Sequence, residues 1–380
     1  MNSPYPKRIV SIVLNSFESD NRVLRTAQSL SSAGYDVTVL ALKLGNLPAE
    51  EVRDGFRVKR MEVISRKLPA VPFSTMLQTS ETLMRVAKEC AKYDIVHCND
   101  FLPMIAVAMM KALNPSLKVV YDSHEYARER KGLDAVQKLA VKTLEPLVIK
   151  FADQVMTVSD SIAAEYERLY NLKGVHTILN TPHRHNLTQS NILRDNLKIP
   201  TSKTIFLYQG GLIDGRGIHL LLRAFEELQD TSAVIVFMGY GPFESEVVRA
   251  SLLNSNVYYQ KSVPYDKLVD YTSSADYGLL SVENVCLSYY YCMPNKLFEY
   301  IQARIPIITT NLPDCRGVVE TEELGLVIPE FTPKSFASTI KKALETDPGK
   351  FSVALEVAAQ KYHWQNEEKK LLDIFASLHS

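Results

Sequence analysis

The fold of this 380-residue chain is decided by residues 8–42, which read RIVSIVLNSFESDNRVLRTAQSLSSAGYDVTVLAL. The run 9–14 is largely apolar, which is the pattern of a strand buried on both faces of a parallel sheet. After a polar turn, the apolar residues of 23–30 recur at helical spacing, and Gly34 suits the end of a helix. A second apolar run, 37–42, completes what we predict to be a βαβ unit.

The same alternation continues to the end of the chain. Further strands are expected near residues 56–64, 94–98, 118–122, 154–158, 175–179, 204–209, 233–238, 256–260, 276–281 and 305–310. Helical patterns lie between them, among others at residues 217–229, 243–253, 265–274, 295–303 and 333–346. We therefore expect an α/β protein with two doubly wound, Rossmann-like domains facing each other across a cleft. Such domains bind ligands outside the carboxyl ends of their strands.

One polar and irregular segment, residues 180–203, separates the two sets of strands. The predicted organisation is an N-terminal domain over 1–182, a linker over 183–203 and a C-terminal domain over 204–355. The stretch 350–378 reads as one helix, and we expect residues 356–380 to pack back toward the N-terminal domain.

Composition excludes several classes of protein. Lys and Arg number 43, as do Asp and Glu, so bulk electrostatic binding of nucleic acid is not expected. The five cysteines form no CxxC pair, which argues against a disulfide framework and a thiolate zinc site. No stretch approaches the roughly 18 apolar residues of a membrane span. We expect a cytoplasmic protein without a signal peptide.

The loops exclude two common cofactor sites. The first strand-to-helix turn, NSFESDN, lacks the glycines of a dinucleotide-binding domain. The pair Gly239 and Gly241 lacks a third glycine, and the chain contains no P-loop pattern.

A helix in the C-terminal half carries candidate binding groups. The sequence CMPNKLFEYIQA, residues 292–303, places Pro294 at the start of a helix and Leu297 on its buried face. Lys296 and Glu299 are three residues apart and share another face. The helix N-terminus and Lys296 favour an anion, while Glu299 can accept hydrogen bonds from paired hydroxyl groups. A sugar nucleotide offers both; the alternative is a Lys–Glu pair on a solvated helix face.

A glycine-rich loop is a second candidate for anion binding. In YQGGLIDGRGIHLLLRAF, residues 208–225, a strand is followed by four glycines, one arginine and a helix. Gly210 and Gly211 are the first two of these glycines, and they allow close approach of the backbone to a ligand. Arg216, at the helix start, can hold phosphate oxygens.

Together these motifs resemble the retaining, GT-B-fold glycosyltransferases of family four, which use nucleotide sugars, over nearly the whole chain. PNKLFEY, residues 294–300, is the most specific match, followed by the loop with Arg216 and Gly217 ahead of LLRAF. MGYGPFESEV (238–247), YDSHEY (121–126) and LNTP (179–182) support it. The N-terminal segment is similar to that of capsule, lipopolysaccharide and cell-wall transferases of this family.

The resemblance implies roles for individual residues. Glu299 would bind the donor ribose, with Asn295, Lys296 and Leu297 in the same pocket. Arg216 would neutralise the donor pyrophosphate beside Gly210 and Gly211, and Gly239 and Gly241 would line the nucleotide side. His124 would reach toward the transferred sugar. The catalytic set implied is therefore His124, Arg216, Lys296 and Glu299, with no cofactor and no metal expected, since the chain has no DxD pattern.

Three positions depart from the usual pattern of the family. Tyr291 stands where the family often has a first glutamate, with seven residues between it and the second. Gly211 stands where the pyrophosphate loop commonly has an arginine. The helix-ending glycine after PNKLFEY is also replaced, by Arg304.

The N-terminal half holds the candidates for the acceptor side. Asp20, Arg22, His97 and Asp100 all lie in or next to turns that follow predicted strands. A helix cap, a surface charge and loop packing are the alternative explanations for them. The stretch 128–150 is amphipathic with six basic and three acidic residues, which would suit peripheral contact with an anionic membrane at its inner face. A solvated helix face is the alternative, and the small net charge favours it.

We thus predict a retaining glycosyltransferase that moves a sugar from a UDP- or GDP-sugar to a glycan or lipid-linked acceptor in surface polysaccharide biosynthesis. Two rivals remain open at this point. One is a nucleotide-sugar epimerase or hydrolase on the same scaffold, and the other is a catalytically silent binding partner of another transferase.

Overall fold

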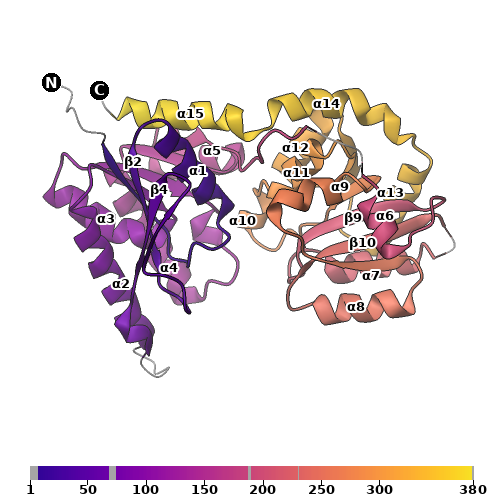
Figure 1. Cartoon of the computed structure of the whole chain (residues 1–380), viewed down its shortest axis with the longest axis horizontal. Coiled ribbons are helices and arrows are strands. Elements are labelled where there is room, and N and C mark those ends of the chain that lie inside the picture. The colour runs from indigo at the N-terminus through magenta and orange to yellow at the C-terminus, as the bar shows by residue number, and fades with distance from the viewer. Residues whose placement is uncertain (1–6, 68–73, 187–189, 230, 379–380) are drawn as a thin grey trace. The chain divides into compact units, whose positions relative to one another are not determined.

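A computed structural model describes residues 7–67, 74–186, 190–229 and 231–378 of the chain (Figure 1). The chain divides into two compact units. Unit 1 comprises Met1–Leu179 with Glu368–Ser380, and unit 2 comprises Asn180–Glu367.

Unit 1 is built on an eight-stranded sheet in the order β3-β4-β2-β1-β5-β6-β7-β8. Its strands are β1 Arg8–Ile12, β2 Asp36–Leu42, β3 Glu50–Arg53, β4 Phe56–Met61, β5 Ile95–Asn99, β6 Lys118–Ser123, β7 Gln154–Thr157 and β8 His176–Thr177. All pairs are parallel except β3 with β4. From β1 the chain builds the sheet in one direction and from β5 in the other. The topological switch point, where such sheets bind ligands, therefore lies between β1 and β5.

The helices of unit 1 connect successive strands and cover the sheet. They are α1 Asn21–Ser32, α2 Ser74–Cys90, α3 Phe101–Leu113, α4 Ala135–Val148 and α5 Asp160–Tyr170, and α2, α3 and α4 pack in sequence against one another. Part of α15, Trp364–Ser377, also belongs to this unit. There the ring of Phe375 meets the rings of Tyr35 and His97 edge-on.

Unit 2 repeats the architecture with six parallel strands in the order β11-β10-β9-β12-β13-β14. They are β9 Thr204–Gly211, β10 Ala233–Tyr240, β11 Val257–Lys261, β12 Tyr277–Leu280, β13 Ile307–Thr310 and β14 Gly325–Ile328. The helices are α6 Ile192–Leu197, α7 Ile218–Glu226, α8 Glu244–Leu253, α9 Leu268–Thr272, α10 Leu287–Tyr290, α11 Asn295–Gln302, α12 Pro313–Thr321, α13 Pro333–Leu344 and α14 Ser352–Lys361. Here the switch point lies between β9 and β12.

The predicted fold class, two doubly wound Rossmann-like units with parallel sheets, is confirmed. The structure differs from the expected linker, because α6 forms within it. Leu193 is fully buried there, and Arg194 forms an ion pair with Asp276 of unit 2. Residues 187–189 of that linker lie outside the described residues.

The C-terminal stretch is two helices and not the single helix that the sequence indicates. Tyr362 leaves the helical conformation, with φ −100° and ψ 75°, and ends α14. The backbone N–H of Trp364, the first residue of α15, then donates to the carbonyl oxygen of Pro182 at 2.7 Å. The interruption thus coincides closely with the boundary between the units at residue 367.

Candidate functional site

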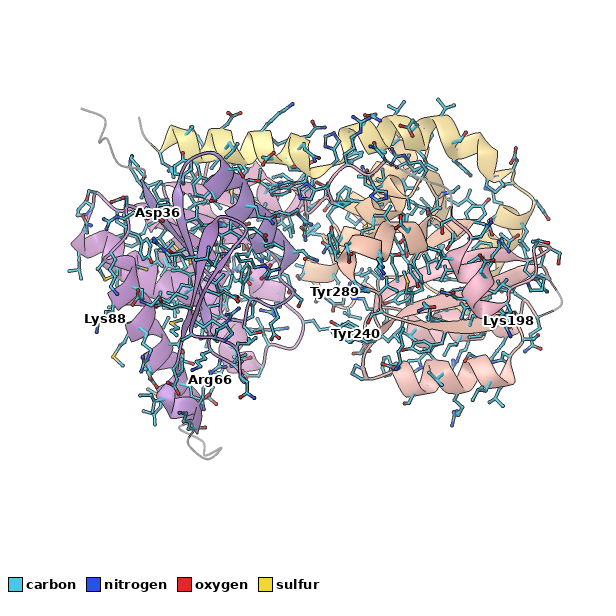
Figure 2. All side chains as sticks on the ribbon, viewed as in Figure 1. Asp36, Arg66, Lys88, Lys198, Tyr240 and Tyr289 are labelled. Atoms are coloured by element: carbon cyan, nitrogen blue, oxygen red, sulfur yellow. The ribbon has the colours of Figure 1, made fainter. Side chains whose placement is uncertain are left out.

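The candidate site of unit 2 lies at the switch point between β9 and β12. The glycine-rich loop 212–217 follows β9, and residues 281–294 follow β12 and lead into α11. Figure 2 shows Tyr289 of α10 and Tyr240, the last residue of β10, far from Lys198, which precedes β9. The motifs selected from the sequence therefore meet at the carboxyl ends of the strands.

The glycine-rich loop is held rigidly by the segment after β12. Gly217 has φ 71°, and a side chain on it would come within 2.6 Å of the carbonyl oxygen of Ser281. The Ser281 hydroxyl donates to the carbonyl oxygen of Arg216 at 2.7 Å. Glu283 accepts from the Gly217 N–H at 3.1 Å, and its own N–H donates to Gly215. Glu283 therefore shapes the loop that carries Arg216.

Lys296 and Glu299 are both only 9% exposed, so the solvated-face alternative is wrong. The ammonium group of Lys296 lies 3.9 Å from the centre of the Tyr208 ring. Gly210 has φ 118°, a conformation that favours glycine, and a β-carbon there would make ordinary van der Waals contact with Lys296, 3.6 Å from its Cε. Burial, and then the positive charge of Arg216, lower the pKa of Lys296 to about 7. A buried cation beside a second cation favours an anionic ligand.

A chain of hydrogen bonds fixes the carboxylate of Glu299. The side-chain amide of Gln209 donates to Glu299 Oε2 at 2.5 Å, and the hydroxyl of Thr272 donates to Gln209 Oε1 at 2.7 Å. The Tyr300 hydroxyl donates to the carbonyl oxygen of Leu207 at 3.0 Å, which ties α11 to β9. Neither Gln209 nor Thr272 is predicted from the sequence as a site residue. A polar residue within the apolar strand 204–209 was the signal available for Gln209.

Arg216 completes this cluster, with its guanidinium 4.5 Å from the centre of the Tyr289 ring. The remaining predicted residues lie around it with different surroundings. Asn295 Oδ1 accepts a hydrogen bond from Asn180 at 2.6 Å, whereas Leu297 is fully buried in the core. Gly211 ends β9, next to Gly210.

Gly239 and Gly241 are required by the packing of the backbone. A β-carbon on Gly239 would lie 1.9 Å from the carbonyl oxygen of Gly210, and one on Gly241 would lie 2.6 Å from that of Leu212. The two glycines therefore bring the ends of β9 and β10 together at the edge of the site.

Unit 1 has a polar cluster at its own switch point. Arg22 forms a two-pronged ion pair with Asp122 at 2.8 and 2.9 Å, and both side chains are buried. His97 Nε2 lies 3.4 Å and His124 Nε2 3.5 Å from the same carboxylate. His124 Nε2 is also 3.0 Å from Asn99 Oδ1.

The surroundings shift the pKa values of the two histidines in opposite directions. Burial lowers the pKa of His97, which is fully enclosed. Burial opposes the charged form of His124 too, but the carboxylates of Asp100 and Asp122 outweigh it and raise its pKa to about 9. At neutral pH His124 is therefore an imidazolium whose Nε2–H can donate to Asn99.

The predicted acceptor-side residues separate into two groups. Asp20 and Asp100 line one pocket of about 650 Å³ within unit 1, together with His124 of the predicted catalytic set. Arg22 and His97 do not line the pocket. They are buried, at 4% and 0% exposure, and lie against the carboxylate of Asp122. Asp20 also caps α1, accepting from the N–H of Val23 at 3.2 Å, so the cap that the sequence suggested is present.

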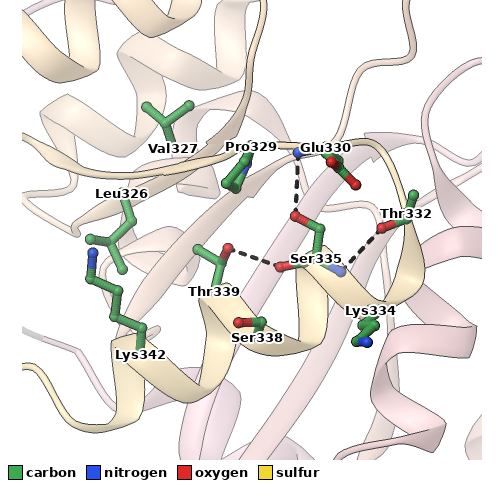
Figure 3. Close-up of a pocket in the computed structure, with 10 residues that line it drawn as sticks. All are labelled: Leu326, Val327, Pro329, Glu330, Thr332, Lys334, Ser335, Ser338, Thr339 and Lys342. Atoms are coloured by element: carbon green, nitrogen blue, oxygen red, sulfur yellow. Dashed lines mark hydrogen bonds between the residues drawn. The ribbon is translucent and has the colours of Figure 1, made fainter.

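A pocket of about 490 Å³ lies between β14 and α13 (Figure 3). Three of its hydroxyl groups form local hydrogen bonds of the helix: Thr332 accepts from the Ser335 N–H, and Ser335 Oγ accepts from the Glu330 N–H. Thr339 donates to the carbonyl oxygen of Ser335. These contacts explain the hydroxyl groups of Thr332, Ser335 and Thr339 as local structure.

The described part of the chain contains neither a group of metal ligands nor a membrane-spanning helix. Among residues 7–67, 74–186, 190–229 and 231–378, no three His, Cys, Asp or Glu side chains are grouped so that they could hold a metal ion. Within the same residues, no helix has the length and apolar character needed to cross a membrane.

Comparison with known families identifies the class of protein. The family "Glycosyltransferase Family 4" matches residues 20–181, and "Glycosyl transferases group 1" matches residues 189–362. The fold and these two matches define the chain as a glycosyltransferase of the two-domain GT-B type. The two matches together span most of the chain, and its N-terminal half is similar to the family-four glycosyltransferases.

Curated relatives are similar over most of their length. D-inositol 3-phosphate glycosyltransferase of Corynebacterium urealyticum is 22% identical over 392 residues, covering 94% of this chain and 89% of the relative. The putative teichuronic acid biosynthesis glycosyltransferase TuaC of Bacillus subtilis is 25% identical over 312 residues, covering 75% of each chain.

Solved structures share the fold at low sequence identity. Sucrose-phosphate synthase from Thermosynechococcus elongatus superimposes with a TM-score of 0.80 at 18% identity, covering 98% of this chain and 99% of that one. Anabaena HepE, solved in complex with UDP and glucose, gives a TM-score of 0.71 at 13% identity, covering 98% and 100%.

Proposed function

We propose that the protein transfers a sugar, with retention at the anomeric carbon, from a nucleotide-diphosphate sugar to a glycan or lipid-linked acceptor. UDP is favoured over GDP because HepE was solved with UDP. The name of TuaC supports a role in surface polysaccharide biosynthesis. The proposed location is the cytoplasm, with peripheral contact at the inner face of the membrane.

The observation that carries this proposal is the cluster of the buried Lys296 and Glu299 with the half-buried Arg216 at the switch point of unit 2. In the reaction, the bond from the acceptor oxygen to the anomeric carbon forms as the bond to the phosphate oxygen breaks. The diphosphate leaves with the electron pair and takes the acceptor's proton. Two fixed cations stabilise the negative charge that develops on it. This assignment requires no metal and no cofactor.

The remaining groups bind and orient the donor. Glu299, held by Gln209, accepts hydrogen bonds from the ribose hydroxyls. Gly210 and the loop that carries Arg216 let the pyrophosphate approach the backbone. His124, charged at neutral pH, offers a hydrogen-bond donor on the acceptor side.

The two rival functions make different predictions about products. An epimerase or hydrolase would release an isomerised donor or free sugar without an acceptor. A silent binding partner would turn over no donor; the matches to transferase families argue against it.

Nucleotide sugars tested by thermal stabilisation and by release of nucleoside diphosphate would decide the proposal. One donor from a panel of UDP-, GDP- and ADP-sugars should raise the unfolding midpoint of the wild type, since it binds only the native state. Glu299→Ala should lose that effect, while Glu330→Ala, far along the chain in a different pocket, should keep it. No response to any nucleotide sugar would contradict the proposal.

A further inference from the structure

We infer that the acceptor is an amphiphile and that the pocket of unit 1 receives its hydrocarbon segment. This inference rests on the proposed function, and it selects a lipid-linked acceptor over a glycan without an apolar group. The pocket of about 650 Å³ lies within the size range of small-molecule sites, roughly 300–1,000 Å³.

The pocket combines polar groups at the strand ends with an apolar wall, and Thr75, Thr79 and Arg130 add further polar groups to its lining. The polar end is formed by residues at the carboxyl ends of β1, β5 and β6, namely Asn15, Asp20, Asn99, Asp100, His124 and Glu125. Most of the apolar wall comes from α3 and α4 with the turn before α4, namely Phe101, Leu102, Pro103, Ile105, Leu133, Ala140, Val141 and Leu144. Such a division suits a molecule with a hydroxyl-bearing head and a hydrocarbon tail.

The helix α4 presents one continuous face to the pocket. Residues 133, 137, 140, 141 and 144 recur at the spacing of one helical face, and only Gln137 among them is polar. Gln137, Ala140 and Leu144 of this face are exposed to solvent. A hydrocarbon chain that lies on this face would remove apolar surface from water, whereas a sugar chain would place hydroxyl groups against it.

The α4 wall is anchored from behind, so the pocket is a built feature of the fold. Glu145 of α4 is fully buried and accepts hydrogen bonds from the hydroxyls of Tyr121 and Tyr166, each at 3.0 Å. The Tyr170 hydroxyl donates to the same carboxylate. Ser123, next to His124, bonds the Tyr166 hydroxyl at 2.8 Å. The network therefore connects the helix wall to the strand that carries His124.

Apolar side chains continue from the pocket mouth over the outer surface of α4. Leu102 and Leu144 line the pocket and remain 37% exposed. On α4, Val136, Leu139 and Leu147 are 77%, 67% and 55% exposed. A hydrocarbon chain that leaves the pocket would cover this surface, which gives a reason for apolar residues on a helix that also carries Lys138 and Lys142.

The experiment compares octyl β-glucoside, below its micelle concentration, with methyl β-glucoside as a matched probe that lacks the chain. Ala140→Trp fills the pocket from an exposed position, whereas Thr143→Trp adds the same bulk to an exposed position of α4 outside the lining. Octyl glucoside should raise the unfolding midpoint of the wild type and of Thr143→Trp by about 2 °C or more. It should have no effect on Ala140→Trp, and methyl glucoside should have no effect on any of the three proteins.

Two results would overturn the inference. An equal response of Ala140→Trp to octyl glucoside would place the hydrocarbon on the outer surface of α4, and an equal response to methyl glucoside would show that the chain is not recognised. Leu144→Asp, which puts a charge at the exposed mouth, provides a second variant and should also lose the response. Stabilisation by the nucleotide sugar is measured on the same samples. Its absence in the wild type contradicts the proposed function and not the pocket.

Discussion

Gln209 is the residue through which β9 positions the carboxylate of Glu299. Both polar atoms of its amide group form hydrogen bonds: the nitrogen donates to Glu299 and the oxygen accepts from Thr272. Gln209 itself is 2% exposed. A carboxylate that is to receive two ribose hydroxyls gains from such fixation, because less rotamer freedom is lost when the ligand binds.

Gln209→Leu keeps the volume and removes the hydrogen bond to Glu299. A hydrogen bond to a charged group contributes about 1.5–3 kcal/mol, so the KM for the donor should rise roughly 10- to 100-fold, with a smaller change in kcat. Gln229→Leu, at an exposed glutamine of the same unit, is the control and should leave both constants unchanged. A purely structural role for Gln209 would weaken UDP and 2′-deoxy-UDP equally. Positioning of Glu299 predicts a larger loss for UDP.

The sequence alone indicates those candidate site residues that lie together in a single motif. Lys296 and Glu299 are identified by their spacing within one helix, and Arg216 by the loop around it. Gln209 and Thr272 are 63 residues apart, and Gln209 and Glu299 are 90 residues apart. Their contact depends on how β9, α9 and α11 pack, and no local pattern records that packing.

At the scale of elements, Gly239 determines how closely β10 approaches β9. The two strands pair in parallel, with Gly239 opposite Gly210. A β-carbon at 1.9 Å from the Gly210 carbonyl oxygen has no space, and the obstacle is backbone that cannot rotate away. This glycine therefore maintains the strand ends on which the donor site is built.

Gly239→Ala should destabilise unit 2 by several kcal/mol, because the ends of β9 and β10 must separate to admit the methyl group. Gly317→Ala is the matched control: this glycine lies within α12, and a β-carbon there meets nothing within 4 Å. It should raise the free energy of unfolding by about 0.5–1 kcal/mol, since alanine favours the helix. Urea unfolding measures both. Equal effects of the two variants would contradict the close-approach argument.

Most of the buried strands of both sheets lie within a few residues of their expected positions. The edge strands β3 and β14 were missed. EEVR of β3 has no pattern of a buried face, and its residues are intermediate or exposed. GLVI of β14 is apolar but only four residues long, and three of its four residues are only partly buried. The helix α6 was missed because a polar segment became ordered by a single buried leucine, Leu193, and the ion pair of Arg194 with Asp276.

On the scale of the whole molecule, two cations, the half-buried His124 and the buried Lys296, couple stability to pH with opposite signs. The pKa of His124, in unit 1, rises from 6.5 to about 9 on folding, and that of Lys296, in unit 2, falls from 10.5 to about 7. The His124 contribution is complete below pH 6.5 and is lost as the pH rises through 9. Folding is penalised at Lys296 below pH 7, and the penalty disappears between pH 7 and 10.5.

Between pH 7 and 9 the effects of His124 and Lys296 on the free energy of unfolding should cancel in the ligand-free wild type. Each group contributes a slope of about 1.4 kcal/mol per pH unit, negative for His124 and positive for Lys296. His124→Gln removes the negative slope, so its free energy of unfolding should rise relative to the wild type from pH 7 to 9. Lys296→Met removes the positive slope, so its free energy of unfolding should fall relative to the wild type from pH 7 to 9. Urea unfolding at pH 7, 8 and 9 measures these differences.

Because His124 lies in unit 1 and Lys296 in unit 2, the cancellation depends on whether the two units unfold together or separately. If the chain unfolds in one transition, the wild type shows little change in stability over this range and the two variants diverge. If the units unfold separately, the transition of unit 1 should weaken and that of unit 2 should strengthen as the pH rises, in the wild type itself. Parallel slopes in the two variants would contradict both pKa assignments. Adding the donor should then remove the slope due to Lys296, because a diphosphate beside the ammonium group restores the charged form.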